Sequence, residues 1–159
     1  MINQILYIFI AYFIGSISFG ILASKIFNIT DPRAMGSKNP GATNVLRTGN
    51  KYAAVFTLLG DMLKATLVVG IALSLNFSGN FLTAVILAVL LGHMYPIFYN
   101  FKGGKGVATA LGILLAINWE LALFTLLIWI IIFFISKYSS LSAIIAAIAS
   151  PLIAYTLNQ

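Results

Sequence analysis

Long apolar segments are the feature that most constrains how this chain can fold. Residues 52–75 carry only two charged side chains, and residues 81–99 carry none. A helix needs about 20 such residues to cross the hydrocarbon core of a bilayer. Across the chain, 61% of the residues are hydrophobic, 8% are charged and the mean hydropathy is +1.04. These values exclude an ordinary soluble domain and predict an integral membrane protein.

The apolar runs predict helices rather than the strands of a barrel. They are continuous and rich in Leu, Ile, Ala and Gly, without the alternation typical of barrel strands. A chain of 159 residues accommodates about five to seven spans of roughly 20 residues each. We therefore expect an all-α, polytopic transmembrane helical bundle, with residues 1–159 as a single domain. The chain has no cysteine and one histidine, so we expect neither disulfides nor a metal site.

About six helices are expected. Their ranges are 2–27, 52–75, 81–99, 107–117, 121–135 and 141–157. We expect the first to be one retained helix, because it has neither a positive n-region nor a signal-peptide cleavage site. Four small residues in this helix predict close packing against a neighbouring helix. They are Gly15, Ser16, Ser18 and Gly20.

The stretch from Val107 to Ile135 allows two interpretations. Its first apolar run would be only about 16 Å long as a helix, and residues 118–120 interrupt it. It can form two helices or one long helix with a central charge. With two helices, eight of the nine Lys and Arg residues lie in or beside the first, third and fifth connections. This bias favours two helices and predicts an outside N-terminus with these three loops in the cytoplasm.

The first of these loops, GSKNPGATNVLR, has the composition of an anion site. Gly36 and Gly41 let the backbone turn its amides inward, and Arg47 offers a planar fork that matches phosphate. The loop also contains four neutral donors, namely Ser37, Asn39, Thr43 and Asn44. The alternative is an ordinary solvated loop, which would not need so many uncharged donors beside one arginine.

The second loop, FKGGKG, resembles a phosphate cradle in composition. Its glycines are Gly103, Gly104 and Gly106. Lys105 adds a point charge, and the helix that begins near Val107 presents its positive end to the loop. The loop is not a nucleotide P-loop, because Tyr99 stands where that motif needs glycine. Lys102 can equally be an anchor that follows the positive-inside rule.

The third loop, KYSSLS, places hydroxyls at the entrance to the last predicted helix. They belong to Ser139, Ser140 and Ser142. Hydroxyls at this position either cap free backbone amides or bind an anion.

Three titratable residues lie inside the predicted helices. Asp61 and Lys64 are three residues apart and therefore share a helical face, which predicts a buried ion pair. A proton or ion relay is the alternative. His93 lies near the cytoplasmic end of its helix, where it can donate to a ligand or hydrogen-bond a neighbouring helix.

Taken together, GSKNPGATNVLR, GHMYPIFYNFKGGKGVAT and the SSLS segment resemble, in this order, the motifs of the bacterial acyl-phosphate:glycerol-3-phosphate acyltransferase (PlsY) family. The resemblance spans nearly the whole chain. It implies an enzyme that transfers a fatty acyl group from acyl phosphate to the 1-hydroxyl of sn-glycerol 3-phosphate. The products would be lysophosphatidate and phosphate, in phospholipid synthesis. The resemblance also implies that no metal or other cofactor is needed.

The same resemblance implies roles for individual residues. Ser37, Arg47 and Lys105 would be catalytic, with Lys105 stabilising charge that develops on the acyl phosphate. The remaining substrate-binding residues would be Asn39, Gly41, Thr43, Asn44, His93, Gly103, Gly104, Gly106, Ser140 and Ser142. Members of the family usually have a seventh helix and a further cytoplasmic segment, which we expect to be missing from a chain that ends at Gln159. Without that segment we expect weaker binding of glycerol 3-phosphate or weaker deprotonation of its hydroxyl.

The expected location is the bacterial inner membrane, in a multi-pass arrangement with lipid around the helices and no nucleic-acid partner. The residues leave the oligomeric state open. They also leave a second function open, a small transporter or binding protein for an organic phosphate. Such a protein would usually place its binding groups near the membrane midplane on broken helices, whereas these loops crowd one interface. A purely structural membrane subunit would leave the donor-rich loops without a purpose.

Overall fold

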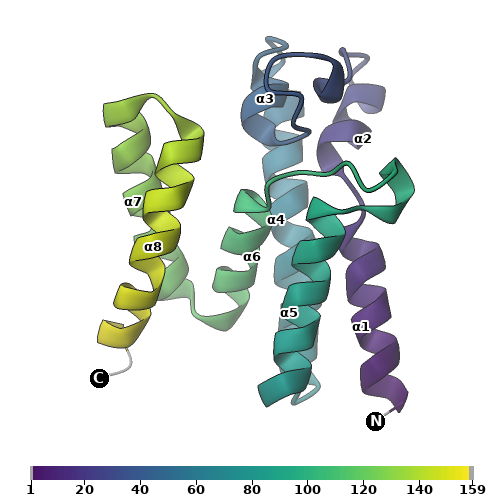
Figure 1. Cartoon of the computed structure of the whole chain (residues 1–159), viewed down its shortest axis with the longest axis vertical. Helices are drawn as coiled ribbons and strands as arrows, with labels where there is room; N and C mark the ends of the chain where they lie inside the picture. Colours follow the sequence, from purple (N-terminus) through teal and green to yellow (C-terminus); the bar gives the residue numbers. More distant parts are fainter. Residues whose placement is uncertain (1, 158–159) are drawn as a thin grey trace. The chain divides into compact units, whose positions relative to one another are not determined.

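A computed structural model describes residues 2–157 of the chain, and all regular structure in that range is helical (Figure 1). The elements are α1 (Ile2–Gly15), α2 (Phe19–Ile26), η1 (Pro32–Ala34), α3 (Ala42–Leu46), α4 (Lys51–Ser74), α5 (Gly79–Met94), η2 (Ile97–Tyr99), α6 (Val107–Ile117), α7 (Trp119–Ser136) and α8 (Ser139–Leu157). The predicted all-α membrane fold is confirmed. The chain divides into two compact units, one ending at Ile113 and one beginning at Leu114. The single domain remains a prediction.

Among residues 2–157, four helices are long and apolar enough to cross a bilayer, namely α4, α5 with the turn through Tyr99, α7 and α8. The bent pair α1 and α2 would make a fifth span. Helix α6 has 11 residues and is apolar but shorter than a span. Each of the six predicted helical segments therefore has a helical counterpart among residues 2–157.

The first predicted helix is not continuous, and our expectation of one unbroken helix is wrong. Helix α1 ends at Gly15, α2 begins at Phe19, and the two are bent by 43°. Two carbonyl groups in the break accept hydrogen bonds from Lys64, and the N–H of Phe19 donates to Asp61 at 3.4 Å. Charged groups of α4 thus replace bonds that a continuous helix would make within itself.

Small residues on either side of this break do pack closely, as predicted. A Cβ atom at Gly15 would overlap the backbone of Val89 in α5, and one at Gly20 would overlap the backbone of Pro40. The contact at Gly20 holds the first loop directly against α2.

The prediction of two helices between residues 107 and 135 is confirmed. Asn118 is extended, with φ −157°, and its side chain accepts a hydrogen bond from the N–H of Leu121 at 2.9 Å. This is an N-cap, which supplies a partner to an otherwise unpaired amide of the first turn of α7.

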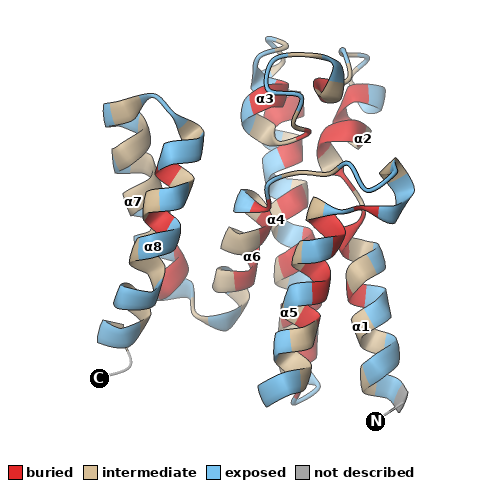
Figure 2. Ribbon diagram, viewed as in Figure 1, coloured by how far each residue is buried: buried red, intermediate tan, exposed pale blue. Residues whose placement is uncertain are grey.

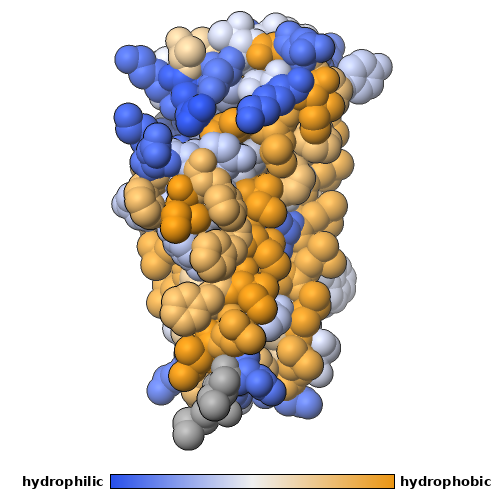
Figure 3. Space-filling model, turned by 90° about the vertical axis from the view of Figure 1, so that its right-hand side faces the viewer, coloured by the Kyte–Doolittle hydropathy of each residue, from blue (hydrophilic) through white to orange (hydrophobic). Residues whose placement is uncertain are grey.

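In the first unit, α1 packs against α5, and α2 and α3 pack against α4. A small buried cluster at the loop end of α4 fixes α3 in place (Figure 2). Its members are Ala23, Val45, Ala53 and Ala54, with Phe27, Ile29 and Phe56 packed against them. In the second unit, α7 and α8 pack against each other. Figure 3 shows a face on which apolar side chains cover the helices and hydrophilic side chains gather at the end that carries the loops.

Candidate active site

The first loop is organised around Asn44, which lies in α3 and is only 3% exposed. Its amide nitrogen donates to three backbone carbonyls, those of Pro32 (2.6 Å), Met35 (3.1 Å) and Asn39 (3.0 Å). An amide has two hydrogens, so this nitrogen has no donor left for a ligand. In this structure the Asn44 side chain shapes the loop, and its contact with phosphate remains a prediction.

The other end of the same side chain brings two predicted catalytic residues together. Oδ1 of Asn44 accepts from the N–H of Ser37 at 3.1 Å and from Nη1 of Arg47 at 3.5 Å. Ser37 and Arg47 are both exposed. Gly36 lies between these groups with φ +53°, and a Cβ there would overlap Oδ1 of Asn44 and lie 2.9 Å from Nη1 of Arg47. Only glycine allows this close approach.

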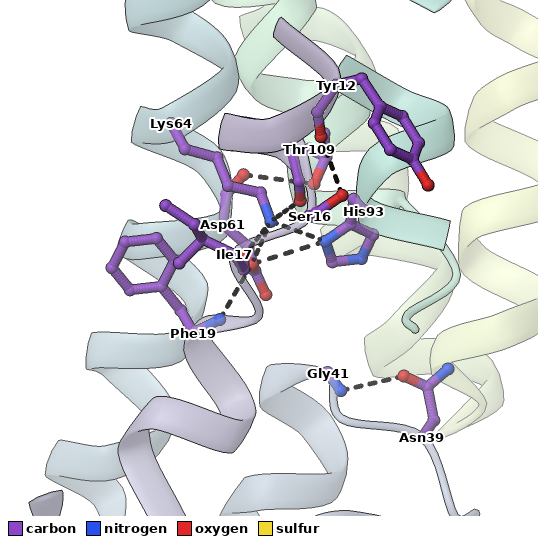
Figure 4. Close-up of polar contacts among 11 residues, drawn as sticks. Tyr12, Ser16, Ile17, Phe19, Asn39, Gly41, Asp61, Lys64, His93 and Thr109 are labelled. Atoms are coloured by element: carbon purple, nitrogen blue, oxygen red, sulfur yellow. Dashed lines mark hydrogen bonds and ion pairs between the residues drawn. The ribbon is translucent and has the colours of Figure 1, made fainter. Parts of the chain in front are cut away.

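The remaining predicted residues of the first loop lie at its surface. Oδ1 of Asn39 accepts from the N–H of Gly41 at 2.9 Å, in a turn that leads into α3 (Figure 4). Thr43 is exposed on α3. The Asn39 side chain is half-buried, so neither residue lies in the buried core of the loop.

In the second loop, two amides that we expected to face phosphate have other acceptors. The N–H of Gly103 donates to the carbonyl of Met94 at 3.2 Å, and that of Gly104 donates to the carbonyl of His93 at 3.1 Å. A Cβ at Gly103 would overlap the His93 carbonyl, and one at Gly104 would overlap the His93 ring. These glycines close the C-terminal end of α5, and the part of their amides in phosphate binding remains a prediction.

The other two predicted residues of the glycine loop, Lys105 and Gly106, lie at the start of α6, and their roles remain predictions. Gly106 has φ +80°, and its carbonyl accepts from the N–H of Ala110 at 2.7 Å, which starts α6. Lys105 is exposed just before that helix. An exposed ammonium beside a helix N-terminus is a favourable environment for an anion.

An ion pair that our reading of the sequence did not single out connects the two loops. Nη2 of Arg33 lies 2.7 Å from Oδ2 of Asp31, and Nε lies 3.1 Å from Oδ1. The hydrogen bond from Arg33 holds the pKa of Asp31 below its ordinary value, although partial burial opposes this. The guanidinium carbon lies 5.9 Å from the ring centroid of Tyr99, which precedes the glycine loop. The sequence signal was an acid and a base two positions apart around Pro32.

Asp61, Lys64 and His93 form a buried cluster at the break between α1 and α2 (Figure 4). Nζ of Lys64 lies 2.9 Å from Oδ1 of Asp61, which confirms the predicted ion pair. Nδ1 of His93 lies 3.1 Å from Nζ and 3.4 Å from the same Oδ1. His93 thus contacts a neighbouring helix, and its part in substrate binding remains a prediction. A hydroxyl from α6 joins the cluster, because Thr109 donates to the carbonyl of Asp61 at 3.2 Å.

The serines of the third loop lie in the second unit. Ser139 and Ser140 begin α8, and Ser140 is exposed. Ser142 is buried, and its hydroxyl donates to the carbonyl of Tyr138 at 2.8 Å. The participation of Ser140 and Ser142 in a phosphate site remains a prediction.

Fold and loops together define a multi-pass helical membrane protein with basic and hydroxyl groups exposed at one end of its first helical unit. Within the described range, no three His, Asp or Glu side chains are grouped so as to hold a metal ion. The family model described as glycerol-3-phosphate acyltransferase matches residues 5–159. The chain belongs to this family of membrane acyltransferases, and the resemblance drawn from its motifs is confirmed.

Individual relatives agree with this assignment. A glycerol-3-phosphate acyltransferase of Cupriavidus pinatubonensis is 54% identical over 152 residues, which cover 93% of this chain and 75% of the relative. A second glycerol-3-phosphate acyltransferase, from Methylobacillus flagellatus, is 53% identical over 155 residues, which cover 98% of this chain and 79% of the relative. Among solved structures, the integral membrane acyltransferase PlsY in its glycerol 3-phosphate form matches with a TM-score of 0.91 at 42% identity, covering 98% of this chain and 78% of that one. Its lysophosphatidic acid form matches with a TM-score of 0.89 at 41% identity.

Proposed function

We propose that this protein transfers a fatty acyl group from acyl phosphate to the 1-hydroxyl of sn-glycerol 3-phosphate, giving lysophosphatidate and inorganic phosphate. The family assignment supports an acyltransferase that acts on glycerol 3-phosphate. The related PlsY structures are described as glycerol 3-phosphate and lysophosphatidic acid forms, which are a substrate and a product of this reaction. The acyl phosphate donor is implied by the resemblance of the motifs to the family.

The observation that carries the proposal is that Ser37 and Arg47 both donate to Oδ1 of Asn44. A buried amide holds an exposed hydroxyl-bearing residue and an exposed guanidinium close together. A guanidinium binds phosphate oxygens through two parallel hydrogen bonds, and a neighbouring hydroxyl supplies a third. Because the first loop is preorganised in this way, little reorganisation is needed when a phosphate group binds.

The reaction needs positioning and charge neutralisation more than it needs a covalent intermediate. The hydroxyl oxygen of glycerol 3-phosphate bonds to the acyl carbon, the bond from that carbon to the phosphate oxygen breaks, and the hydroxyl proton passes to the released phosphate. Arg47 and Lys105 neutralise the two phosphate groups, and Lys105 stabilises charge on the departing phosphate. In this scheme Asn44, Gly103 and Gly104 are positioning residues.

The proposed location is the bacterial inner membrane, with the N-terminus outside and the loops in the cytoplasm. Exposed basic residues at the loop end of the first unit support this orientation. They are Lys38, Arg47, Lys51, Lys102 and Lys105. Acyl phosphate would keep its chain in the lipid, between helices, while its phosphate reaches the loops.

The test uses the purified protein in lipid vesicles with palmitoyl phosphate and labelled glycerol 3-phosphate. We expect labelled lipid and released phosphate only when both substrates are present. Arg47→Ala should lower the rate by roughly 10- to 100-fold, because hydrogen bonds to a charged group contribute about 1.5–3 kcal/mol. Lys51→Ala, which removes another exposed basic side chain, is the matched control. Label that enters the vesicles unchanged, with no lipid formed, would instead support the transporter.

A further inference from the structure

The buried cluster of Asp61, Lys64 and His93 has no role in the phosphate chemistry proposed above. These side chains are 2%, 5% and 6% exposed, respectively. Charged groups inside a membrane protein are costly, and apolar residues of similar size often pack as stably as a buried ion pair. A cluster kept in spite of that cost suggests that it specifies one geometry rather than adding stability.

Counting hydrogens shows how the cluster is bonded. The ammonium of Lys64 has three hydrogens, and three oxygens surround it, the carbonyls of Gly15 (2.9 Å) and Ile17 (2.6 Å) and Oδ1 of Asp61 (2.9 Å). Nδ1 of His93 is the fourth neighbour and the most distant, at 3.1 Å. In the arrangement proposed below, each of the three oxygens takes one ammonium hydrogen and Nδ1 carries a hydrogen of its own. The nearest acceptor for such a hydrogen is Oδ1 of Asp61, which lies 3.4 Å from Nδ1.

The opposite side of His93 contacts the glycine loop. The backbone carbonyl of His93 accepts a hydrogen bond from the N–H of Gly104 at 3.1 Å. A Cβ on Gly104 would overlap Nε2 of His93, so the ring edge and the loop backbone are in direct contact. The orientation of the imidazole therefore decides where Gly104 can lie, and Lys105 is the next residue along the chain.

We propose that Asp61, with its charge balanced by Lys64, fixes the Nδ1–H form and the orientation of His93, and that the fixed imidazole positions the glycine loop that carries Lys105. All three members of the cluster are then positioning residues. The catalytic consequence rests on the proposed function, because it assumes that Lys105 acts on the acyl phosphate. The hydrogen-bonding pattern itself does not depend on the reaction.

A matched pair of variants tests the proposal through activity. The amide nitrogen of asparagine can take the position of Nδ1, whereas the amide of glutamine reaches the position of Nε2. We expect both variants to lower the rate of acyl transfer by at least about tenfold, because asparagine leaves no atom beside Gly104 and glutamine leaves no hydrogen bond to Asp61. A rate within about threefold of the parent in His93→Gln would mean that the bond at Nδ1 is unimportant. A rate within about threefold of the parent in His93→Asn would mean that the ring edge does not position the loop. Either result would overturn the proposal.

A spectroscopic measurement on the unmodified chain avoids any variant that fails to fold. His93 is the only histidine in the sequence, so protein labelled with ¹⁵N-histidine gives the signals of a single imidazole. We expect a hydrogen on Nδ1 and a change in its shift in the double variant Asp61→Asn with Lys64→Met. A ring protonated only on Nε2 would overturn the proposal. If the expected spectrum is found in a protein that does not transfer acyl groups, the proposed function fails while the positioning of the loop stands.

Discussion

Replacing Asn44 should loosen the first loop before any substrate binds. Its side chain makes four hydrogen bonds of 2.6–3.1 Å to the loop backbone and a fifth of 3.5 Å to Arg47. Such bonds contribute about 0.5–1.5 kcal/mol each. Because two hydrogens serve three carbonyls and the loop lies at the surface, we expect Asn44→Ala to destabilise the ordered loop by about 2–4 kcal/mol. That corresponds to roughly a 30- to 1,000-fold change in the opening equilibrium.

Hydrogen exchange measures this effect directly in the ligand-free protein. We expect the amides around Ser37 to exchange faster by up to that factor in Asn44→Ala, and kcat/KM for glycerol 3-phosphate to fall at least about tenfold. Asn44→Asp keeps the shape but places a carboxylate oxygen against three carbonyls, so it should be worse than alanine. Asn80→Ala, at an exposed position in the first turn of α5, is the control.

One result would refute this reasoning. If Asn44→Ala leaves exchange unchanged in the absence of substrate but raises KM, the side chain acts by contacting phosphate, as the sequence suggested. If neither quantity changes, the hydrogen bonds around Asn44 do not hold the loop.

Three further predictions concern packing, capping and pH. Gly92→Ala should lower the melting temperature, by an overpacking cost of about 1–3 kcal/mol, because its Cβ would overlap the backbone of α1. Gly70→Ala, where nothing lies within 4 Å, should not lower it, and equal losses would contradict the packing argument. Asn118→Ala should speed hydrogen exchange in the first turn of α7, because it removes a cap worth about 1 kcal/mol. Unchanged exchange would show that the cap is unimportant. The ion pair of Asp31 and Arg33 contributes less than about 1 kcal/mol to stability, because the pair is more than a third exposed. This contribution depends on the lowered pKa of Asp31. It should be present above about pH 4 and disappear as the pH falls through that lowered pKa. The protection factors of the η1 amides, which are corrected for the intrinsic exchange rate at each pH, should therefore fall only in acid, and Asp31→Asn should remove this dependence. A change in protection between about pH 5 and pH 7 would contradict the assignment.

The helices were largely predictable because hydropathy acts locally. Runs of apolar residues predicted the six helical segments, and the charge bias separated α6 from α7 at Asn118, where the structure has a cap. The break after Gly15 was not predictable in the same way. Its carbonyls bond to Lys64, which lies 49 residues further along the chain, and no local pattern of apolar residues reveals such a partner.

The candidate site was predictable in composition but not in bonding. Donor-rich loops predicted an anion site, and the structure places Ser37 and Arg47 on the same amide. Which donors are already used cannot be read from residue types. The amides of Gly103 and Gly104 close a helix end instead of facing the loop exterior, and this depends on how α5 terminates in three dimensions.

The break in the first span has a consequence for how the membrane protein works. In ion-coupled carriers, unwound carbonyls and a carboxylate commonly surround a sodium ion or proton that arrives and leaves during each cycle. Here two carbonyls and a carboxylate surround the ammonium of Lys64, which is covalently attached to α4. A tethered cation cannot exchange with the solution. The break is therefore a permanent feature of the scaffold, and its geometry should be the same whatever the sodium gradient across the membrane.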